Sequence, residues 1–143
     1  MNDVRRPKEH EQMMSDLCQS DKKIFNTYKD CLVFAACLGS AKNEHRSFEK
    51  SSEPVGMHIF RGEFDETVFH AIALAEIKDP MIMSEANTAK RIKLFEEYAC
   101  GGLDIIKNRI YESPEGWESA IVSLLAEKSP DERNILDDIT DFV

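Results

Sequence analysis

The sequence lacks the usual markers of secretion, membrane insertion and disulfide-rich folds. Its first ten residues are polar and charged, without the apolar core of a secretory signal. The longest apolar run, Cys31–Leu38, has eight residues, whereas a membrane-spanning helix needs roughly 20. We therefore expect a cytoplasmic protein that does not enter a membrane and keeps its four cysteines reduced.

Glycine and proline are also scarce, with 6 and 5 residues in a chain of 143, and the hydrophobic fraction is 42%. This composition excludes a low-complexity chain and is typical of a folded soluble protein. The length fits one domain. We expect a helical domain at 1–128, followed by an acidic amphipathic segment at 129–143.

Recognisable catalytic and metal-binding motifs are absent from the sequence. There is no GxSxG, Walker A or HExxH motif and no CxxC-like pair, and the four histidines are scattered. Glu96 and Glu97 are adjacent, so in a helix their side chains point about 100° apart; we expect a solvated face rather than an acid–base pair. Cys37 is expected in the core. These patterns predict a protein that is not an enzyme and holds no metal or cofactor.

Charge is distributed unevenly along the chain. Residues 1–50 carry a net charge of +1 and residues 51–143 carry −10, which together give the formal −9 of the whole chain. Because nucleic acid repels so acidic a protein, any DNA contact must use a local basic face. Only the N-terminal third offers candidates: Arg5, Arg6, Lys8, Lys22, Lys23 and Lys29.

Apolar spacing and capping residues predict several helices in the N-terminal half. Residues 3–10 are expected to form an extended arm, and a short helix is expected over 9–18. Thr27, with Asp30 three residues later, resembles a capping box. The helix that follows is expected to end at Gly39.

Three further helix starts are predicted from a capping residue or from proline in the first turn, at Asp65, Ser84 and Pro114. Phe64 is expected to pack against Phe69 beyond the Asp65 cap, and Gly101 with Gly102 is expected to end the next helix. The last of the three helices is expected to bury Trp117, Ile121, Leu124 and Leu125. Residues 57–60 favour a short strand. The fold class is therefore mainly α: a compact single-domain bundle of about five to seven short helices, with one or two short strands.

The C-terminal segment alternates acidic with large apolar side chains at helical spacing. Its partner-docking candidates are Ile135, Leu136, Ile139 and Phe142. The same residues suit packing on their own domain or docking in the groove of a partner, and the spacing does not separate these alternatives.

Several short motifs, taken in order, carry a family resemblance. They are Arg5-Arg6-Pro7 with His10, Tyr28-Lys29-Asp30, Phe34-Ala35-Ala36 before Leu38-Gly39, Phe48 to Glu53, Ile72 to Glu76, and Phe95 to Ala99 before Gly101-Gly102. Over roughly residues 4–110 the chain resembles the small accessory proteins associated with bacterial DNA phosphorothioation (Dnd-type) modification and restriction systems. It is also similar, more faintly, to the small helical DNA-binding subunit of that machinery, through the stretch Gly62 to Asp65.

The resemblance implies a context in restriction–modification and phage defence, and no reaction. Its motif residues have no assigned role: His10, Asp30, Glu49, Lys50, Glu96, Glu97, Tyr98, Gly101 and Gly102. Together with the charge, it favours a non-enzymatic adaptor or regulator that binds protein partners of the modification and restriction machinery. The alternative is a DNA-binding module for modified, nicked or operator DNA that uses the basic N-terminal segment. A homo-oligomer is compatible with either.

Overall fold

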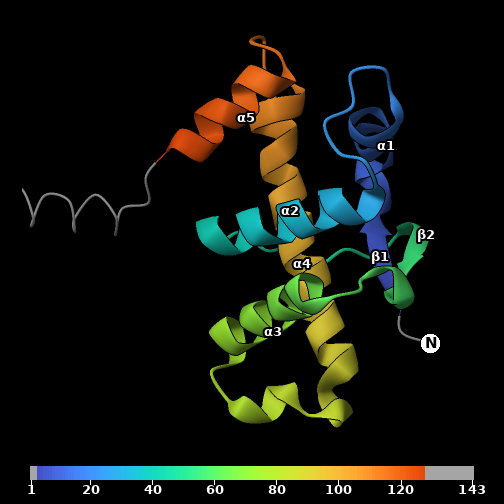
Figure 1. Cartoon of the computed structure of the whole chain (residues 1–143), viewed down its shortest axis with the longest axis vertical. Helices are drawn as coiled ribbons and strands as arrows, with labels where there is room; N and C mark the ends of the chain where they lie inside the picture. Colours follow the sequence, from blue (N-terminus) through green and yellow to red (C-terminus); the bar gives the residue numbers. More distant parts are fainter. Residues whose placement is uncertain (1–2, 128–143) are drawn as a thin grey trace, which may run out of the picture.

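The longest described helix, α4 (Thr88–Ile106), is the central column of the fold (Figure 1). The computed structural model describes residues 3–127. In this range the other helices and strands are β1 (Asp3–Pro7), α1 (Glu11–Gln19), α2 (Tyr28–Lys42), β2 (Ser51–Gly56), α3 (Glu63–Ile77) and α5 (Trp117–Ala126). Short 3₁₀ turns lie at Lys8–His10, Met57–Ile59, Pro80–Met83 and Glu85–Asn87, and a π-helical turn at Lys107–Tyr111. The predicted mainly α single domain is confirmed.

Helices α2 and α4 cross at glycines, in the most closely packed part of the core. A side chain on Gly39 would place its Cβ 2.2 Å from the backbone oxygen of Tyr98. One on Gly102 would place its Cβ 1.7 Å from the backbone oxygen of Ala35. Both distances are shorter than any real Cβ contact, so only glycine lets the two backbones approach this closely.

The prediction that these glycines end their helices is therefore wrong. Helix α2 continues past Gly39 to Lys42 and is closed by Asn43, whose φ of 54° is left-handed. Helix α4 passes through Gly101 and Gly102 without interruption. Glycine inside a helix costs about 1 kcal/mol relative to alanine, and the close packing at the crossing offsets that cost.

The N-terminal residues form a strand rather than the predicted arm. β1 pairs antiparallel with β2, with Val4 opposite Val55, and Val4 is fully buried. The predicted strand at 57–60 is also wrong, since β2 ends at Gly56 and a 3₁₀ turn follows. The buried side chain of Val4 ties the start of the chain to the core.

Capping of α2 is confirmed, because the Thr27 hydroxyl accepts a hydrogen bond from the Asp30 backbone N–H at 3.1 Å. The predicted cap at Asp65 is wrong. Helix α3 starts earlier, after Gly62, whose φ is 91°, and Asp65 is buried inside its first turn. Phe64 is 69% exposed, so it does not pack against Phe69.

Two further predicted helix starts are also displaced. Helix α4 begins at Thr88, after a 3₁₀ turn that follows Ser84, rather than at Ser84 itself. Helix α5 begins at Trp117 after Gly116, whose φ is 89°, and not at Pro114. In both places a short turn separates the predicted starting residue from the helix.

Helix α5 is buried along one side only. Leu124 is buried as predicted, but Leu125, predicted to be buried with it, is 64% exposed. All four cysteines are free. Cys37 is exposed, contrary to its predicted core position, because its side of α2 faces away from α4. In residues 3–127 no helix is long and apolar enough to cross a bilayer.

Candidate functional site

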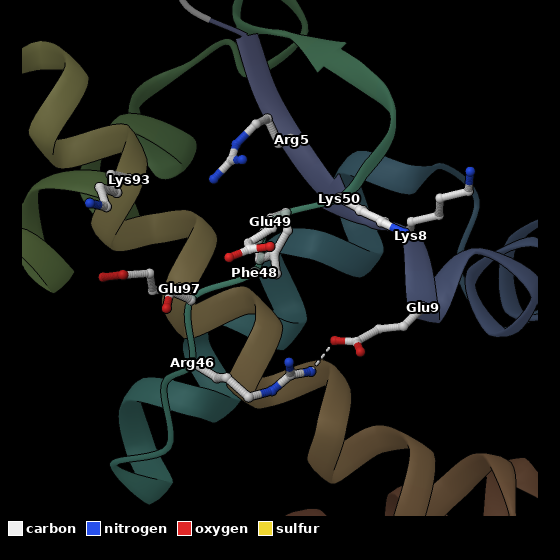
Figure 2. Close-up of a pocket in the computed structure, with 10 residues that line it drawn as sticks. Arg5, Lys8, Glu9, Arg46, Phe48, Glu49, Lys50, Lys93 and Glu97 are labelled. Carbon is white, nitrogen blue, oxygen red and sulfur yellow. Dashed lines mark hydrogen bonds and ion pairs between the residues drawn. The ribbon is translucent and has the colours of Figure 1, made fainter.

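A cleft of about 740 Å³ opens beside α4, between β1 and the loop that follows α2. We call it the mixed-charge cleft, because five basic and three acidic side chains line it together with one aromatic ring. Figure 2 shows these side chains arriving from β1 and the turn after it, from the loop, and from α4. The lining residues are Arg5, Lys8, Glu9, Arg46, Ser47, Phe48, Glu49, Lys50, Lys93 and Glu97.

Arg5 is held in the wall of the cleft by Glu96. The Arg5 backbone N–H donates to Glu96 Oε2 at 2.7 Å, and Arg5 Nε donates to Oε1 at 3.2 Å. The Arg5 guanidinium also lies 4.7 Å from the centre of the Phe48 ring, a distance at which a cation and an aromatic face attract each other. One carboxylate therefore fixes the strand and its side chain to α4.

The prediction of a solvated Glu96–Glu97 face is wrong for the first of the two residues. The Glu96 side chain is 5% exposed. Burial raises the pKa of Glu96, and its contacts with Arg5 oppose that rise. Glu97 lies one position further round α4, is partly exposed and lines the cleft. The first carboxylate is an anchor and the second is available to a ligand.

The lower end of the cleft is closed by an ion-pair network around Arg46 (Figure 2). The Arg46 guanidinium donates to both Asp104 oxygens at 2.9 Å and also to Glu9. His10, which is buried, lies with Nε2 2.7 Å from Asp104 Oδ1. Burial tends to raise the pKa of Asp104, but hydrogen bonds from Arg46 and His10 outweigh it and the pKa is lowered.

The Glu9–His10–Asp104 group has the residue types of a metal site, and its ligand atoms lie within 4.8 Å of one another. The Arg46 guanidinium already bonds to both carboxylates of the group. A fixed cation at this position neutralises the charge that would attract a metal ion, so the geometry favours a structural network.

Three lysines at the cleft have no ion pair or side-chain hydrogen bond to any other residue within 3–127: Lys8, Lys50 and Lys93. All three are exposed. Their ammonium groups, together with the carboxylates of Glu49 and Glu97, are the charges that the cleft offers to a ligand.

The predicted DNA-contact residues do not share one face. Arg6 is buried, donates from Nε to the backbone oxygen of Glu53 at 2.8 Å, and stacks over Tyr28. Lys29 is paired with Asp65 at 3.1 Å.

Lys22 and Lys23 line a separate depression beside Trp117. Of the six candidates, Arg5 and Lys8 reach the mixed-charge cleft. DNA contact by these residues stays a prediction.

Sequence reasoning missed Arg46, Phe48 and Lys93 as cleft residues, because the loop that carries Arg46 and Phe48 meets Lys93 of α4 only through long-range packing. Of the motif residues, Glu49, Lys50 and Glu97 line the cleft.

The remaining motif residues contribute to the framework. The Tyr98 hydroxyl donates to Glu76 at 2.6 Å, which with burial raises the pKa of Tyr98 to about 12. Gly102 lies at the helix crossing, Gly101 lies against the backbone of Glu44 in the loop after α2, and Asp30 lies at the start of α2. The docking candidates Ile135, Leu136, Ile139 and Phe142 lie outside the described residues.

Comparison with known proteins gives one match. Residues 3–142 match the family described as DNA sulphur modification system-associated protein 4. The match extends about thirty residues beyond the resemblance to 4–110 that the sequence motifs carry, and includes most of the C-terminal segment. No curated protein and no solved structure matches the chain significantly.

Proposed function

The chain belongs to this family of proteins associated with DNA sulphur modification, and we propose that it serves such a system as a non-enzymatic adaptor that binds a protein partner in the mixed-charge cleft. The partner is a protein of the modification or restriction machinery. The observation that carries the proposal is the composition of the cleft: three lysines and two glutamates that have no ion pair within residues 3–127 surround one aromatic ring.

Charges of both signs suit a protein ligand better than a nucleic acid. A phosphate backbone meets Lys8, Lys50 and Lys93 favourably, but Glu49 and Glu97 repel it from the same opening. A polypeptide segment can place a carboxylate against the lysines, a cation against the glutamates and an apolar side chain on Phe48. Charge patterns of this kind specify a partner more than they add raw affinity.

The arrangement of the reactive groups supports a binding role. Glu96 and Asp104 are engaged by arginines. Partial desolvation by its neighbours raises the pKa of Cys37, although its side chain is solvent-accessible, so at neutral pH less of it is the nucleophilic thiolate than in a free cysteine. Within residues 3–127 the Cys37 thiol has no hydrogen bond to a basic side chain, which a catalytic thiol requires.

The proposal is tested by co-purification with the modification and restriction proteins from cells that carry a complete system. We expect the Lys50→Glu/Lys93→Glu variant to lose the partner, because reversing both charges makes the opening strongly acidic. Its matched control is Lys78→Glu/Lys90→Glu, which makes the same change of charge at exposed positions outside the cleft. Equal capture by both variants and by the unaltered protein would overturn the proposal.

Direct DNA contact is the second candidate, and the three unpaired lysines favour it. If they bind phosphates, the logarithm of the binding constant must fall with the logarithm of salt with a slope of about −0.9 per contact. Three contacts give a slope of roughly −2.7, and Lys50→Glu/Lys93→Glu, which leaves only Lys8 of the three, should weaken binding and reduce the slope to about −0.9. A gel-shift titration without a shift at low salt rejects this candidate.

A further inference from the structure

A further depression, of about 400 Å³, lies where β1 and β2 meet the start of α2 (Figure 1). We call it the Arg6 pocket. Its walls include Arg6 of β1, Tyr28 of α2, and Glu53 and Val55 of β2. No described residue lines both this pocket and the mixed-charge cleft, although Arg5 and Arg6 are neighbours in β1. The two cavities are therefore separate sites.

The Arg6 guanidinium lies at the wall of this pocket. Its Nε donates to the backbone oxygen of Glu53 at 2.8 Å, and its Cζ lies 4.2 Å from the centre of the Tyr28 ring. Both of these contact residues line the pocket. The side chain is held between a strand and a helix, and the residue is only 5% exposed. The cation is therefore fixed in place before any ligand binds.

The positive charge of Arg6 is not neutralised by any side chain within residues 3–127. Arg6 forms no ion pair in this range, and its Nη1 is buried without a hydrogen-bond partner. The Ser52 hydroxyl, opposite Arg6 in the register of the two strands, is also buried without a partner. A buried charge is costly unless it is paired and hydrogen-bonded. A ligand that brings a negative charge and acceptor atoms to this place would remove that cost.

The other charged groups of the pocket leave the guanidinium as its one unpaired cation among the described residues. Lys29 Nζ is paired with Asp65 Oδ2 at 3.1 Å, so its charge is already balanced. Glu53 is exposed, and it contacts the guanidinium through its backbone oxygen and not through its carboxylate. Val55 and Ile59 add apolar surface to the walls. The pocket therefore offers a fixed cation beside apolar side chains.

We infer that the Arg6 pocket binds a carboxylate on a short apolar body, with the carboxylate against the guanidinium and the apolar body against Val55 and Ile59. The planar guanidinium matches the two oxygens of a carboxylate. The volume of about 400 Å³ lies at the small end of the range for small-ligand sites, about 300–1,000 Å³. Inorganic phosphate has no apolar body to place on the walls. A free small acid and an acidic side chain of a peptide share the required chemistry.

The inference is tested by NMR titration of the full-length, isotope-labelled protein, observed at the Arg6 Nε–Hε signal, which Arg6→Lys identifies by its loss. The probes are phenylacetate, its neutral analogue phenylacetamide, inorganic phosphate, and a blocked tripeptide with one glutamate between two leucines. We expect phenylacetate to shift the signal saturably and to bind at least tenfold more tightly than the amide, which leaves the cation unpaired. Both acids support the inference, and the tighter of the two identifies the source of the carboxylate as a small molecule or a peptide.

Ile59 provides a matched pair of variants, because it lines the pocket and is 45% exposed, so a polar side chain is tolerated there. Ile59→Glu should weaken phenylacetate binding at least tenfold relative to Ile59→Gln, which has the same shape without the repelling charge. Lys50→Glu/Lys93→Glu changes only the mixed-charge cleft and should leave phenylacetate binding unchanged.

Four results would overturn the inference. They are no saturable shift with either acid, equal binding of phenylacetate and its amide, binding of phosphate as tight as that of phenylacetate, and equal binding by the two Ile59 variants. Loss of phenylacetate binding in Lys50→Glu/Lys93→Glu would place the acid in the cleft and would overturn it as well. The proposal of partner binding in the cleft stands or falls separately, because the two sites share no lining residue.

Discussion

Helix α4 passes through two regions that differ in what they tolerate: the glycine crossing with α2 and the mixed-charge cleft. At the crossing, Gly102 lies against the backbone of Ala35. About two turns earlier, Lys93 and Glu97 project into an open cleft. The crossing depends on the absence of side chains and the cleft depends on their charges. Changes at the crossing should therefore affect folding, and changes at exposed cleft residues should affect binding.

The largest expected effect comes from adding one methyl group at the crossing. Gly102→Ala places a Cβ 1.7 Å from the Ala35 backbone oxygen, and backbone at this position cannot move aside without separating the helices. We expect the free energy of unfolding to fall by about 3 kcal/mol or more, measured by urea denaturation.

Gly116→Ala is the control for the crossing, because Gly116 has a φ of 89° and no atom lies within 4 Å of the position that a Cβ would take there. It should cost only the conformational strain of a φ and ψ (89° and 157°) that glycine adopts almost alone, about 1–3 kcal/mol. If Gly102→Ala lowers the free energy of unfolding no more than Gly116→Ala does, the close approach of the α2 and α4 backbones does not require glycine at position 102.

The next prediction compares Glu96, which fixes β1 to α4, with Glu97, which is partly exposed in the cleft. Glu96→Ala leaves the Arg5 backbone N–H without its acceptor, and we expect a loss of about 2 kcal/mol in the free energy of unfolding. Glu97→Ala, one residue away and partly exposed, should change it by less than about 0.5 kcal/mol. Equal losses in the two variants would show that the anchor role of Glu96 is wrong.

A smaller effect concerns pH. Because the folded-state pKa of Asp104 lies below its ordinary value of 3.8, its contribution to stability is complete above about pH 5 and is lost as the pH falls through the ordinary value and then the lowered folded-state pKa. Urea midpoints measured from pH 7 to pH 2.5 should therefore show the deficit of Asp104→Asn largest near neutrality and shrinking in acid. A deficit that grows in acid would contradict the stated direction of the pKa shift.

The smallest expected effect is a difference in reaction rate between the exposed thiol and the buried thiols of the unaltered protein. Cys37 is exposed, whereas Cys100 is buried and burial raises its pKa to about 12. In the folded protein we expect one thiol to react with a disulfide reagent at neutral pH, and the others only after unfolding. Cys37→Ser should remove the fast reaction. Fast reaction of two or more thiols would show that the core opens readily.

Local signals in the sequence predicted part of the fold. The Thr27 cap and the short helix expected over 9–18, observed as α1, were readable because each depends on residues close in the chain. The N-terminal strand was not readable, since its partner, β2, lies about fifty residues away. The glycines of α2 and α4 suggested helix ends, because a close helix crossing and a helix stop use the same residue type.

The candidate site was less predictable than the fold, for the same physical reason. Arg5 was identified as a basic residue, but its fixed position depends on Glu96, 91 residues away. Arg46 and Asp104, which close the cleft, are 58 residues apart. Composition can show that the N-terminal third is nearly neutral within an acidic chain, but only packing shows which of its charges are already paired.

The most direct test of partner binding in the cleft is amide hydrogen exchange of the protein alone and bound to its co-purified partner. We predict that binding slows exchange in the loop 46–50, which carries Phe48 and Lys50 into the cleft, and that Lys50→Glu/Lys93→Glu removes this protection. Protection confined to other parts of the chain, with loop 46–50 exchanging as fast as in the free protein, would contradict the cleft as the binding site.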